Sequence, residues 1–270
     1  LRSIQGERTV QHRARKRFGQ NFLTDSSVIS RIVNAIEPQA DQLILEIGPG
    51  QAALTWPLAD SGAELVLLEI DRDLAARLTT RFAARDNVRV CTGDALKMDF
   101  SELAEGRRFR LVGNLPYNIS TPLLFHVLQW GALVEDMHFM LQKEVVRRMA
   151  ASPGGKTWGR LSLMCQYHCA VTPLFDVPPS AFSPAPKVDS AIVRLVPHTE
   201  PPVHIGDFRS FETVVARAFS QRRKTLRNSL RGMVEASDME SAGIDPGARP
   251  ETLGLREFAL LSGMLEQEEQ

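Results

Sequence analysis

The sequence predicts an α/β fold, in which a Rossmann-like, largely parallel sheet is followed by a small all-helical C-terminal domain. Short apolar runs alternate with helical patterns from residue 43 to residue 150, as in βα units built around a parallel sheet. The first run leads into Gly48-Pro49-Gly50 and a helix, the strand–turn–helix opening of many nucleotide-binding domains. Beyond Pro201-Pro202 only helical periodicity remains. We therefore expect a first domain over residues 1–200 and a second over residues 201–270.

Apolar spacing and capping residues justify the elements of the first domain. Thr24 or Asp25 can cap a first helix, and Pro38 ends it. Five buried strands are expected at 43–47, 65–69, 88–91, 109–113 and 137–141. Helices at 143–150 and 160–167 precede two β-rich runs, at 171–177 and 190–196.

The C-terminal elements follow a linker at 197–206. Asp207 can cap a helix that continues to Phe219. Further helical segments are expected at 221–230, around 233–242 and at 253–265, the last with an apolar face.

Charge is balanced overall but not locally. Lys and Arg total 32, as do Asp and Glu, so the net charge does not indicate a nucleic-acid partner. However, residues 1–20 and 217–231 are strongly basic, and we expect residues 1–17 to form a flexible basic arm. Two such segments are typical of a phosphate-backbone partner, although either alone could be a solvated surface.

Cysteine count and hydropathy exclude several classes of protein. Three cysteines imply no disulfide framework, and Cys165 and Cys169, with His168 between them, lack further ligands at metal-site spacing. No apolar run reaches membrane-spanning length. We expect a cytoplasmic protein that binds no metal and no membrane, and we expect it to be a monomer.

Four successive strands are each expected to end in a polar or glycine-rich group, and in a parallel sheet such ends line one crevice. The glycines at 48 and 50 let the backbone approach a ligand closely. Glu69 follows about twenty residues later, where a carboxylate accepts both ribose hydroxyls. Asp94 can accept from an adenine amine, and the fourth strand delivers Asn114.

The residues Asn114-Leu115-Pro116-Tyr117 form a motif suited to binding a planar amine. The Asn114 side-chain carbonyl and the Leu115 backbone carbonyl can accept its two N–H groups and favour a more nucleophilic nitrogen. Tyr117 offers a face for a splayed-out base, and an exposed Phe182 on the proline-rich loop 178–188 offers a second face. The alternatives are a proline turn with a buried Tyr and a Phe that caps the core.

These motifs together resemble the KsgA-type ribosomal RNA adenine dimethyltransferases, most closely the bacterial members. The matching segments occur in the family's order over nearly the whole chain: 18–23, 46–55, 69–71, 93–95, 114–117, 182–190 and 219–228. The resemblance implies a Rossmann-like methyltransferase sheet that uses S-adenosylmethionine. One departure is Ala52, where the family usually has Gly. Its methyl group is expected to crowd the methionine part of the cofactor slightly, and we expect this to be tolerated.

The resemblance also implies the roles of individual residues. Cofactor contacts carry over to Asn21, Leu23, Gly48, Glu69, Asp94 and Asn114. The target-base pocket carries over to Asn114, Leu115, Tyr117 and Phe182, the residues expected to act in catalysis. The basic residues expected to contact RNA are Arg15, Lys16, Arg17, Lys187, Arg222, Arg223 and Lys224.

The implied activity is transfer of methyl groups to the N6 amines of two adjacent adenosines near the 3′ end of small-subunit rRNA, during ribosome biogenesis. The expected partner is the pre-small ribosomal subunit. A dehydrogenase is disfavoured, because the glycine turn and Glu69 fit it formally but nothing resembles a hydride-transfer site. A macrolide-resistance-type methyltransferase of large-subunit rRNA and a non-catalytic rRNA-binding assembly factor remain as alternatives.

Overall fold

The structure, a computed structural model, describes residues 21–116 and 119–268. The predicted basic arm, and with it Arg15, Lys16 and Arg17, lies outside the described residues, as does Tyr117. Predictions that concern them therefore stay predictions.

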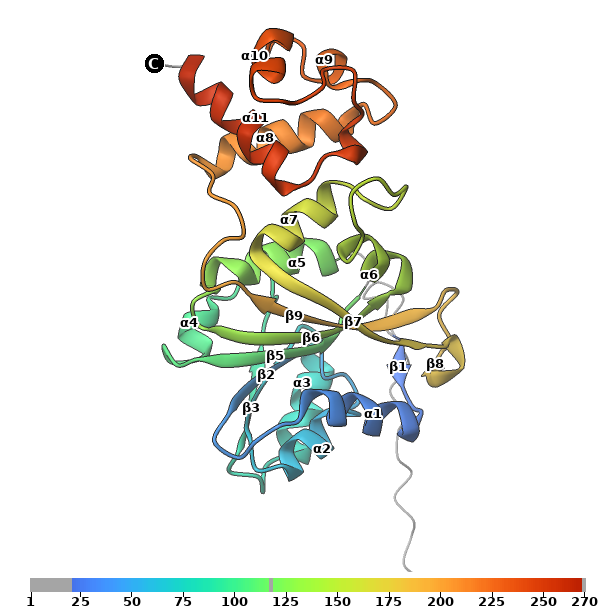
Figure 1. Ribbon diagram of the computed structural model, residues 1–270. Coiled ribbons are helices and arrows are strands. Elements are labelled where there is room, and N and C mark those ends of the chain that lie inside the picture. The colour runs from blue at the N-terminus through green and yellow to red at the C-terminus, as the bar shows by residue number, and fades with distance from the viewer. Residues whose placement is uncertain (1–20, 117–118, 269–270) are drawn as a thin grey trace, which may run out of the picture.

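The core of the molecule is a seven-stranded sheet in the order β4-β3-β2-β5-β6-β9-β7 (Figure 1). The strands are β2 (Leu43–Ile47), β3 (Glu64–Glu69), β4 (Val88–Thr92), β5 (Phe109–Asn114), β6 (Val134–Gln142), β7 (Cys169–Val177) and β9 (Ser190–Pro197). The first five in this order run parallel, whereas β9 is antiparallel to both β6 and β7. Every residue of β2 is buried, as an apolar run in the middle of a parallel sheet should be. The predicted α/β, Rossmann-like class is confirmed.

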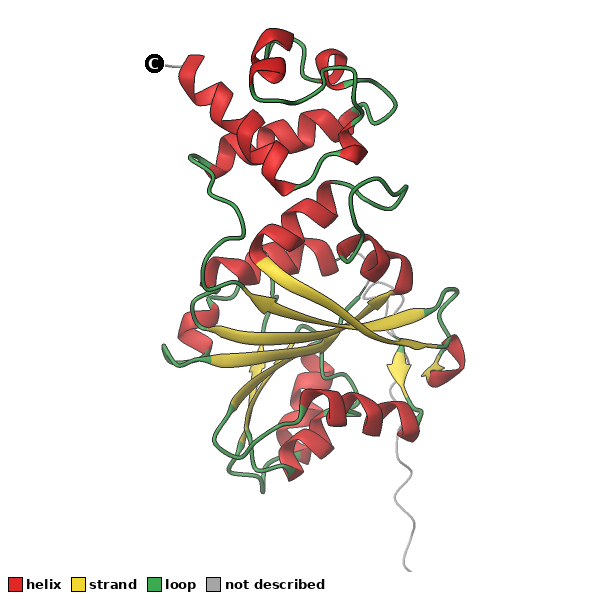
Figure 2. Ribbon diagram, in the orientation of Figure 1, coloured by secondary structure: helices red, strands yellow, loops and turns green. Residues whose placement is uncertain are grey.

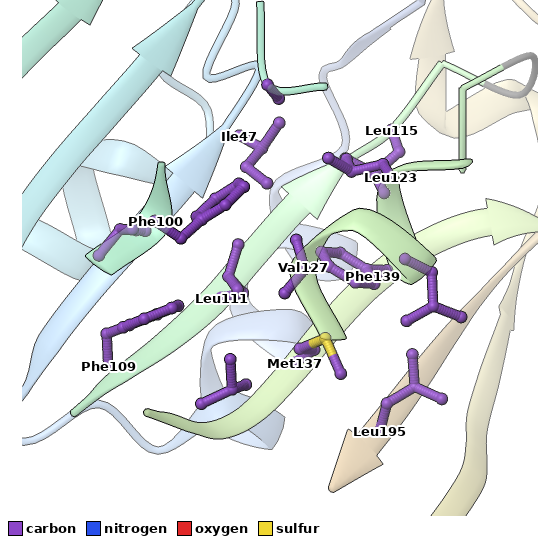
Figure 3. Close-up of a cluster of buried hydrophobic side chains, with 14 of the residues drawn as sticks. Ile47, Phe100, Phe109, Leu111, Leu115, Leu123, Val127, Met137, Phe139 and Leu195 are labelled. Atoms are coloured by element: carbon purple, nitrogen blue, oxygen red, sulfur yellow. The ribbon is translucent and has the colours of Figure 1, made fainter. Parts of the chain in front are cut away.

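Helices cover both faces of this sheet (Figure 2). One face carries α1 (Ser26–Ile36), α2 (Thr55–Asp60) and α3 (Arg72–Arg81), and the other carries α5 (Ser120–Val127), α6 (Lys143–Met149) and α7 (Arg160–His168); the short α4 (Phe100–Leu103) follows β4. Each face has its own apolar core. Figure 3 shows the core beneath α5, where Leu115 lies beside Leu123 at the end of β5.

The capping prediction for the first helix is confirmed for Asp25. Its Oδ1 accepts hydrogen bonds from the backbone N–H groups of Ser27 at 2.8 Å and Val28 at 3.2 Å. The helix ends at Ile36, two residues before Pro38. Asp207 caps α8 in the same way, through the N–H of Ser210 at 2.8 Å.

The C-terminal helices α8 (Phe208–Ser220), α9 (Leu226–Ser229), α10 (Ala236–Ser241) and α11 (Leu255–Glu268) form a third apolar core at one end of the molecule (Figure 1). Trp158, Leu163 and Met164, from α7 and the turn before it, belong to the same core. This core therefore crosses the predicted boundary at residue 200.

The expectation of a helix over 221–230 is wrong, because only the four residues of α9 are helical there. The N–H of Lys224 bonds to the Gln221 carbonyl in a turn, and the N–H groups of Leu226 and Arg227 bond to the carbonyls of Ala248 and Pro246. Backbone N–H groups that bond to distant carbonyls are not available for the hydrogen bonds of a longer helix, so the helix is confined to one turn.

A second, two-stranded sheet was not predicted. β1 (Phe22–Leu23) pairs antiparallel with β8 (Phe182–Ser183), so segments 160 residues apart in sequence lie side by side. The N–H of Thr24 adds a 2.9 Å bond to the Ala181 carbonyl. This pairing brings the start of the described chain against the proline-rich loop.

Candidate active site

A crevice opens at the carboxyl ends of β2, β3, β4 and β5, the edge at which parallel sheets bind ligands. It holds about 1110 Å³ of empty space, including its open mouth. The described residues that the sequence placed at the cofactor or the target base all line it: Asn21, Leu23, Gly48, Glu69, Asp94, Asn114, Leu115 and Phe182. The structure thus brings together residues spread over 160 positions of the chain.

The turn after β2 depends on its glycines. Gly48 and Gly50 have φ values of +66° and +55°, a left-handed region that side chains disfavour. The Gly48 N–H donates to the Leu68 carbonyl at 2.9 Å, and the Gly50 N–H donates to Glu69 Oε2 at 3.1 Å. The turn is therefore tied to the end of β3, with its backbone facing the crevice.

Ala52 shares this left-handed conformation, with a φ of +70°. The expectation that its methyl group crowds the cofactor is wrong, because Ala52 is fully buried in the core under α1 and α2 and does not line the crevice. The departure from Gly therefore strains the backbone rather than narrowing the site.

Glu69 ends β3 with both carboxylate oxygens in use. Oε2 accepts from Gly50, and Oε1 accepts from the N–H of Asp71 at 2.9 Å. Burial raises the pKa of this carboxyl, while the two backbone N–H groups act to lower it. Each carboxylate oxygen has a second lone pair, so the group can also accept from a vicinal diol.

Asp94 lies in the turn after β4, half-buried at the crevice wall. Its Oδ1 accepts from the N–H of Leu96 at 3.1 Å, which fixes the carboxylate at the start of the turn. The turn is joined to β3, because the N–H of Gly93 donates to the Glu69 carbonyl at 3.0 Å. The two carboxylates are thus held on neighbouring strand ends.

Asn114 ends β5, and its Nδ2 donates to the Asn21 carbonyl at 3.0 Å. Because a backbone carbonyl can only accept, this bond defines which end of the amide is NH₂. The side-chain oxygen is the other end, and it is the acceptor that the sequence predicted for an amine.

Leu115 turns its side chain into the core below the crevice, leaving its backbone to face the ligand. Gly113, two residues earlier in β5, has to be glycine. A Cβ on Gly113 would lie 2.8 Å from Leu115 Cδ2 and 2.9 Å from the Ile47 carbonyl oxygen, too close for real atoms. The close packing of β5 on β2 thereby sets the position of the Leu115 carbonyl.

Phe182 lines the crevice, but the expectation that it is exposed is wrong: only 6% of its surface is accessible. Its strand pairs with β1, with Phe182 opposite Leu23, and its ring joins the core under α1. The proline-rich loop is therefore anchored at this residue rather than free in solvent.

Glu46 was missed as a feature of the site. It is the last residue but one of β2, is almost fully buried, lines the crevice and accepts a 2.7 Å hydrogen bond from Thr55 Oγ1. Burial raises the pKa of its carboxyl to about 7. The available signal was a single carboxylate inside an otherwise apolar strand.

The predicted RNA-contacting residues that are described divide into two kinds. Lys187, Arg223 and Lys224 are exposed. Arg222 is half-buried, and its guanidinium donates to the backbone carbonyls of Gly155, Lys156 and Trp158. This cation therefore already has partners within the chain, in the turn before α7.

Metal-binding clusters and membrane-spanning helices are both absent from the described part of the chain. It contains no group of three or more His, Cys, Asp or Glu side chains arranged to hold a metal ion. None of its helices is both long enough and apolar enough to cross a membrane.

The glycine turn and Glu69 also occur in dehydrogenases, but with Asp94 and Asn114 at the next strand ends they assign this Rossmann-like protein to the S-adenosylmethionine-dependent methyltransferases. The chain belongs to the ribosomal RNA adenine dimethylase family, whose model matches residues 11–266.

The chain is similar to characterised proteins over nearly its whole length. It is 57% identical to the ribosomal RNA small subunit methyltransferase A of Pseudomonas putida, over 96% of this chain and 98% of that protein. The crystal structure of a dimethyladenosine transferase from Plasmodium falciparum matches with a TM-score of 0.79 and 26% identity, over 92% of this chain and 98% of that one. The crystal structure of the 23S rRNA methyltransferase ErmE matches with a TM-score of 0.71 and 28% identity, over 92% of this chain and all of that one.

Proposed function

We propose that this protein transfers methyl groups from S-adenosylmethionine to the N6 amines of two adjacent adenosines near the 3′ end of small-subunit rRNA, giving dimethyladenosines. The observation that carries this proposal is the anchored amide of Asn114. Its NH₂ group is occupied by the Asn21 carbonyl, which leaves the amide oxygen at the crevice as an acceptor. An acceptor of this kind holds an amine and would repel a carbonyl substrate.

The hydrogen-bonding groups of the crevice fit the cofactor. Glu69 can accept from the two ribose hydroxyls, Asp94 can accept from the adenine amine, and the turn at Gly48 lets backbone approach the methionine part. When bound, S-adenosylmethionine supplies a methyl group already activated by a positively charged sulfur.

The remaining work falls to Asn114, Leu115 and two aromatic residues. The Asn114 amide oxygen and the Leu115 carbonyl accept the two N–H groups of the amine, which favours a pyramidal nitrogen with an available lone pair. Phe182 and Tyr117 hold the flipped base, so that the amine is aligned with the methyl group. The amine becomes acidic only after methyl transfer, and its proton leaves to solvent without a dedicated base.

The substrate assignment is supported by the comparisons. The 57% identity to a small-subunit methyltransferase exceeds the 28% identity to ErmE, a 23S rRNA enzyme, which disfavours the large-subunit alternative. The intact set of crevice residues disfavours an assembly factor that has lost catalysis. We expect the protein to act as a monomer on the pre-small ribosomal subunit in the cytoplasm, with Arg223, Lys224 and Lys187 among its RNA contacts.

The decisive test supplies labelled S-adenosylmethionine with unmethylated small subunits, large subunits and duplex DNA in parallel, and then analyses the products by mass. We expect dimethyladenosine at two adjacent positions in small-subunit rRNA only. An Asn114→Ala variant, with its cofactor affinity measured separately, is the control for background methylation. Label mainly in large subunits or DNA, or only monomethyladenosine in the small subunit, would contradict the proposal.

A further inference from the structure

A second concave surface lies outside the crevice, along the edge strand β7. We call it the edge groove and define it by Arg31 from α1, Lys143 and Arg147 from α6, and Phe175 and Asp176 from β7. Strand β7 ends the sheet, so the groove faces outward between two helices that cover opposite faces. None of these residues has a part in the cofactor or base sites.

The charge of the edge groove is positive, with three cations against one carboxylate. Lys143 Nζ lies 2.5 Å from Asp176 Oδ2, so this pair is locally neutral. Within the described residues, no carboxylate lies within ion-pair distance of Arg31 or Arg147, and both side chains are exposed. Two guanidinium groups are therefore available to an anionic ligand.

The Arg31 guanidinium is held in a fixed orientation. It lies over the Phe175 ring, 3.9 Å from the ring centroid. A stacked guanidinium keeps its N–H groups at its edge, where they can bind an oxyanion in a bidentate way. A flexible surface arginine would lose more side-chain entropy on binding, so this stacking prepares the site for its ligand.

The edge groove also lies in register with the catalytic asparagine. Asn114 pairs with Met140, Met140 with Ile192, and Ile192 with Phe175, in one row across β5, β6, β9 and β7. Three inter-strand steps place Phe175 about 14 Å from Asn114 along the sheet. A few nucleotides of an unpaired strand can span that distance.

From this charge, preorganisation and distance, we propose that the edge groove binds the phosphate backbone of the RNA strand flanking the target adenosine. The identity of the nucleic acid rests on the proposed function above. Arg31 and Arg147 each bind phosphate oxygens, while Lys143 offsets the charge of Asp176. The contacts fix the strand relative to the base pocket and carry no sequence information.

The test replaces the two available arginines with glutamine, which removes the guanidinium charge and keeps an unbranched polar side chain. An Arg31→Gln, Arg147→Gln double variant is compared with Arg107→Gln, Arg108→Gln. The control removes the same charge from residues just before β5, at the amino ends of the central strands and away from the edge strand β7. Binding to naked, unmethylated small-subunit rRNA is measured over a range of salt concentrations, with thermal melts to check folding. The slope of the logarithm of the binding constant against the logarithm of the salt concentration is compared. We expect the groove variant to flatten this slope by about 1.5 and the control variant to leave it unchanged.

Kinetics separate this proposal from the proposed function. If the groove only positions the strand, the double variant raises KM for small subunits while the affinity for S-adenosylmethionine is unchanged. A wild-type salt slope in a folded groove variant would overturn the inference while leaving the methyltransferase activity standing. Weaker binding to assembled subunits with normal binding to naked rRNA would also overturn it, because the groove would then contact a ribosomal protein.

Discussion

Glu46 and Glu69 are buried carboxylic acids on the neighbouring strands β2 and β3. Glu69 is the last residue of β3 and Glu46 is the last residue but one of β2, and their hydrogen-bond partners differ. Glu69 accepts two backbone N–H groups, whereas Glu46 accepts a single hydroxyl hydrogen bond from Thr55. Fewer donors leave the charge of Glu46 less compensated, and its pKa is raised to about 7 by burial. The two residues therefore respond differently to pH and to substitution.

Replacing Glu46 with Gln should change how the stability of the ligand-free protein depends on pH. The pKa of about 7 in the folded protein lies above the usual 4.5 of a glutamate carboxyl. The stabilising contribution of Glu46 is therefore intact below pH 4.5 and is lost as the pH rises through 7. Gln keeps an oxygen for Thr55 but does not ionise. We expect Glu46→Gln to gain on the order of 3 kcal/mol relative to wild type between pH 4.5 and pH 8, measured by urea unfolding. A stability difference that is the same at both pH values would show that Glu46 does not titrate in this range.

Glu69→Ala and Asp94→Ala should each weaken S-adenosylmethionine binding. Each removes a carboxylate that we propose accepts from the ribose or the adenine, and a lost charged hydrogen bond costs on the order of 1.5–3 kcal/mol. Glu69→Ala also frees the Gly50 N–H, so we expect it to have the larger effect. Calorimetry measures both affinities, with Arg108→Gln as an unrelated surface control. Wild-type affinity in both variants would remove the crevice assignment.

At the scale of whole elements, the pairing of β1 with β8 connects two walls of the crevice, which we propose hold the cofactor and the target base. Asn21 precedes β1 and receives the Asn114 hydrogen bond, while Phe182 begins β8. A disturbance of this small sheet would therefore reach both ligand sites together.

Phe182→Leu is the substitution that tests the base-stacking role of this element. Phe182→Ala would leave a cavity in a buried position and cost several kcal/mol of stability, which would confuse the result. Leu keeps most of the apolar volume and removes the flat ring. We expect turnover to fall by roughly 10-fold or more, because stacking contributes about 1–3 kcal/mol per base, with little change in cofactor affinity. Methylation at the wild-type rate in single-turnover assays would make Phe182 a packing residue.

The long elements could be predicted from the sequence because their signals are repeated along the chain. The apolar runs of β2, β3 and β5 and the cap at Asp25 each carry several agreeing residues. The pairing of β1 with β8 could not be predicted, because two-residue strands have no period and their partner lies 160 positions away. The same limit applies to the site: strand ends identified Glu69 and Asn114, whereas the burial of Phe182 depends on tertiary packing.

At the scale of the whole molecule, we expect the basic run 222–224 to have two functions that the sequence does not separate. Arg222 binds three backbone carbonyls of the turn before α7, whereas Arg223 and Lys224 point to solvent from the following residues. The first cation thus joins the C-terminal helices to the turn before α7, and the side chains of the next two remain exposed.

Separate alanine variants should resolve these two functions. We expect Arg222→Ala to lower the free energy of unfolding by roughly 1–3 kcal/mol, because its charged hydrogen bonds to three backbone carbonyls are lost. We expect Arg223→Ala, Lys224→Ala to leave the melting temperature unchanged and to flatten the salt dependence of rRNA binding by about 1.5. The opposite pattern would assign Arg222 to RNA and the other two residues to folding.

The third apolar core, which contains residues from both sides of the segment 198–204, should hold the two fragments together after a protease cuts this segment. Trp158 Nε1 donates to the Leu253 carbonyl at 2.8 Å, and the N–H of Gly154 donates to the Glu251 carbonyl, so both sides of the exposed segment 198–204 contribute to one packed interior. A single cleavage there would not release an independent module. We expect the nicked chain to migrate as one particle in size-exclusion chromatography and to separate into two fragments only in denaturant. Two separately expressed fragments should then reassemble into a working enzyme when they are refolded together.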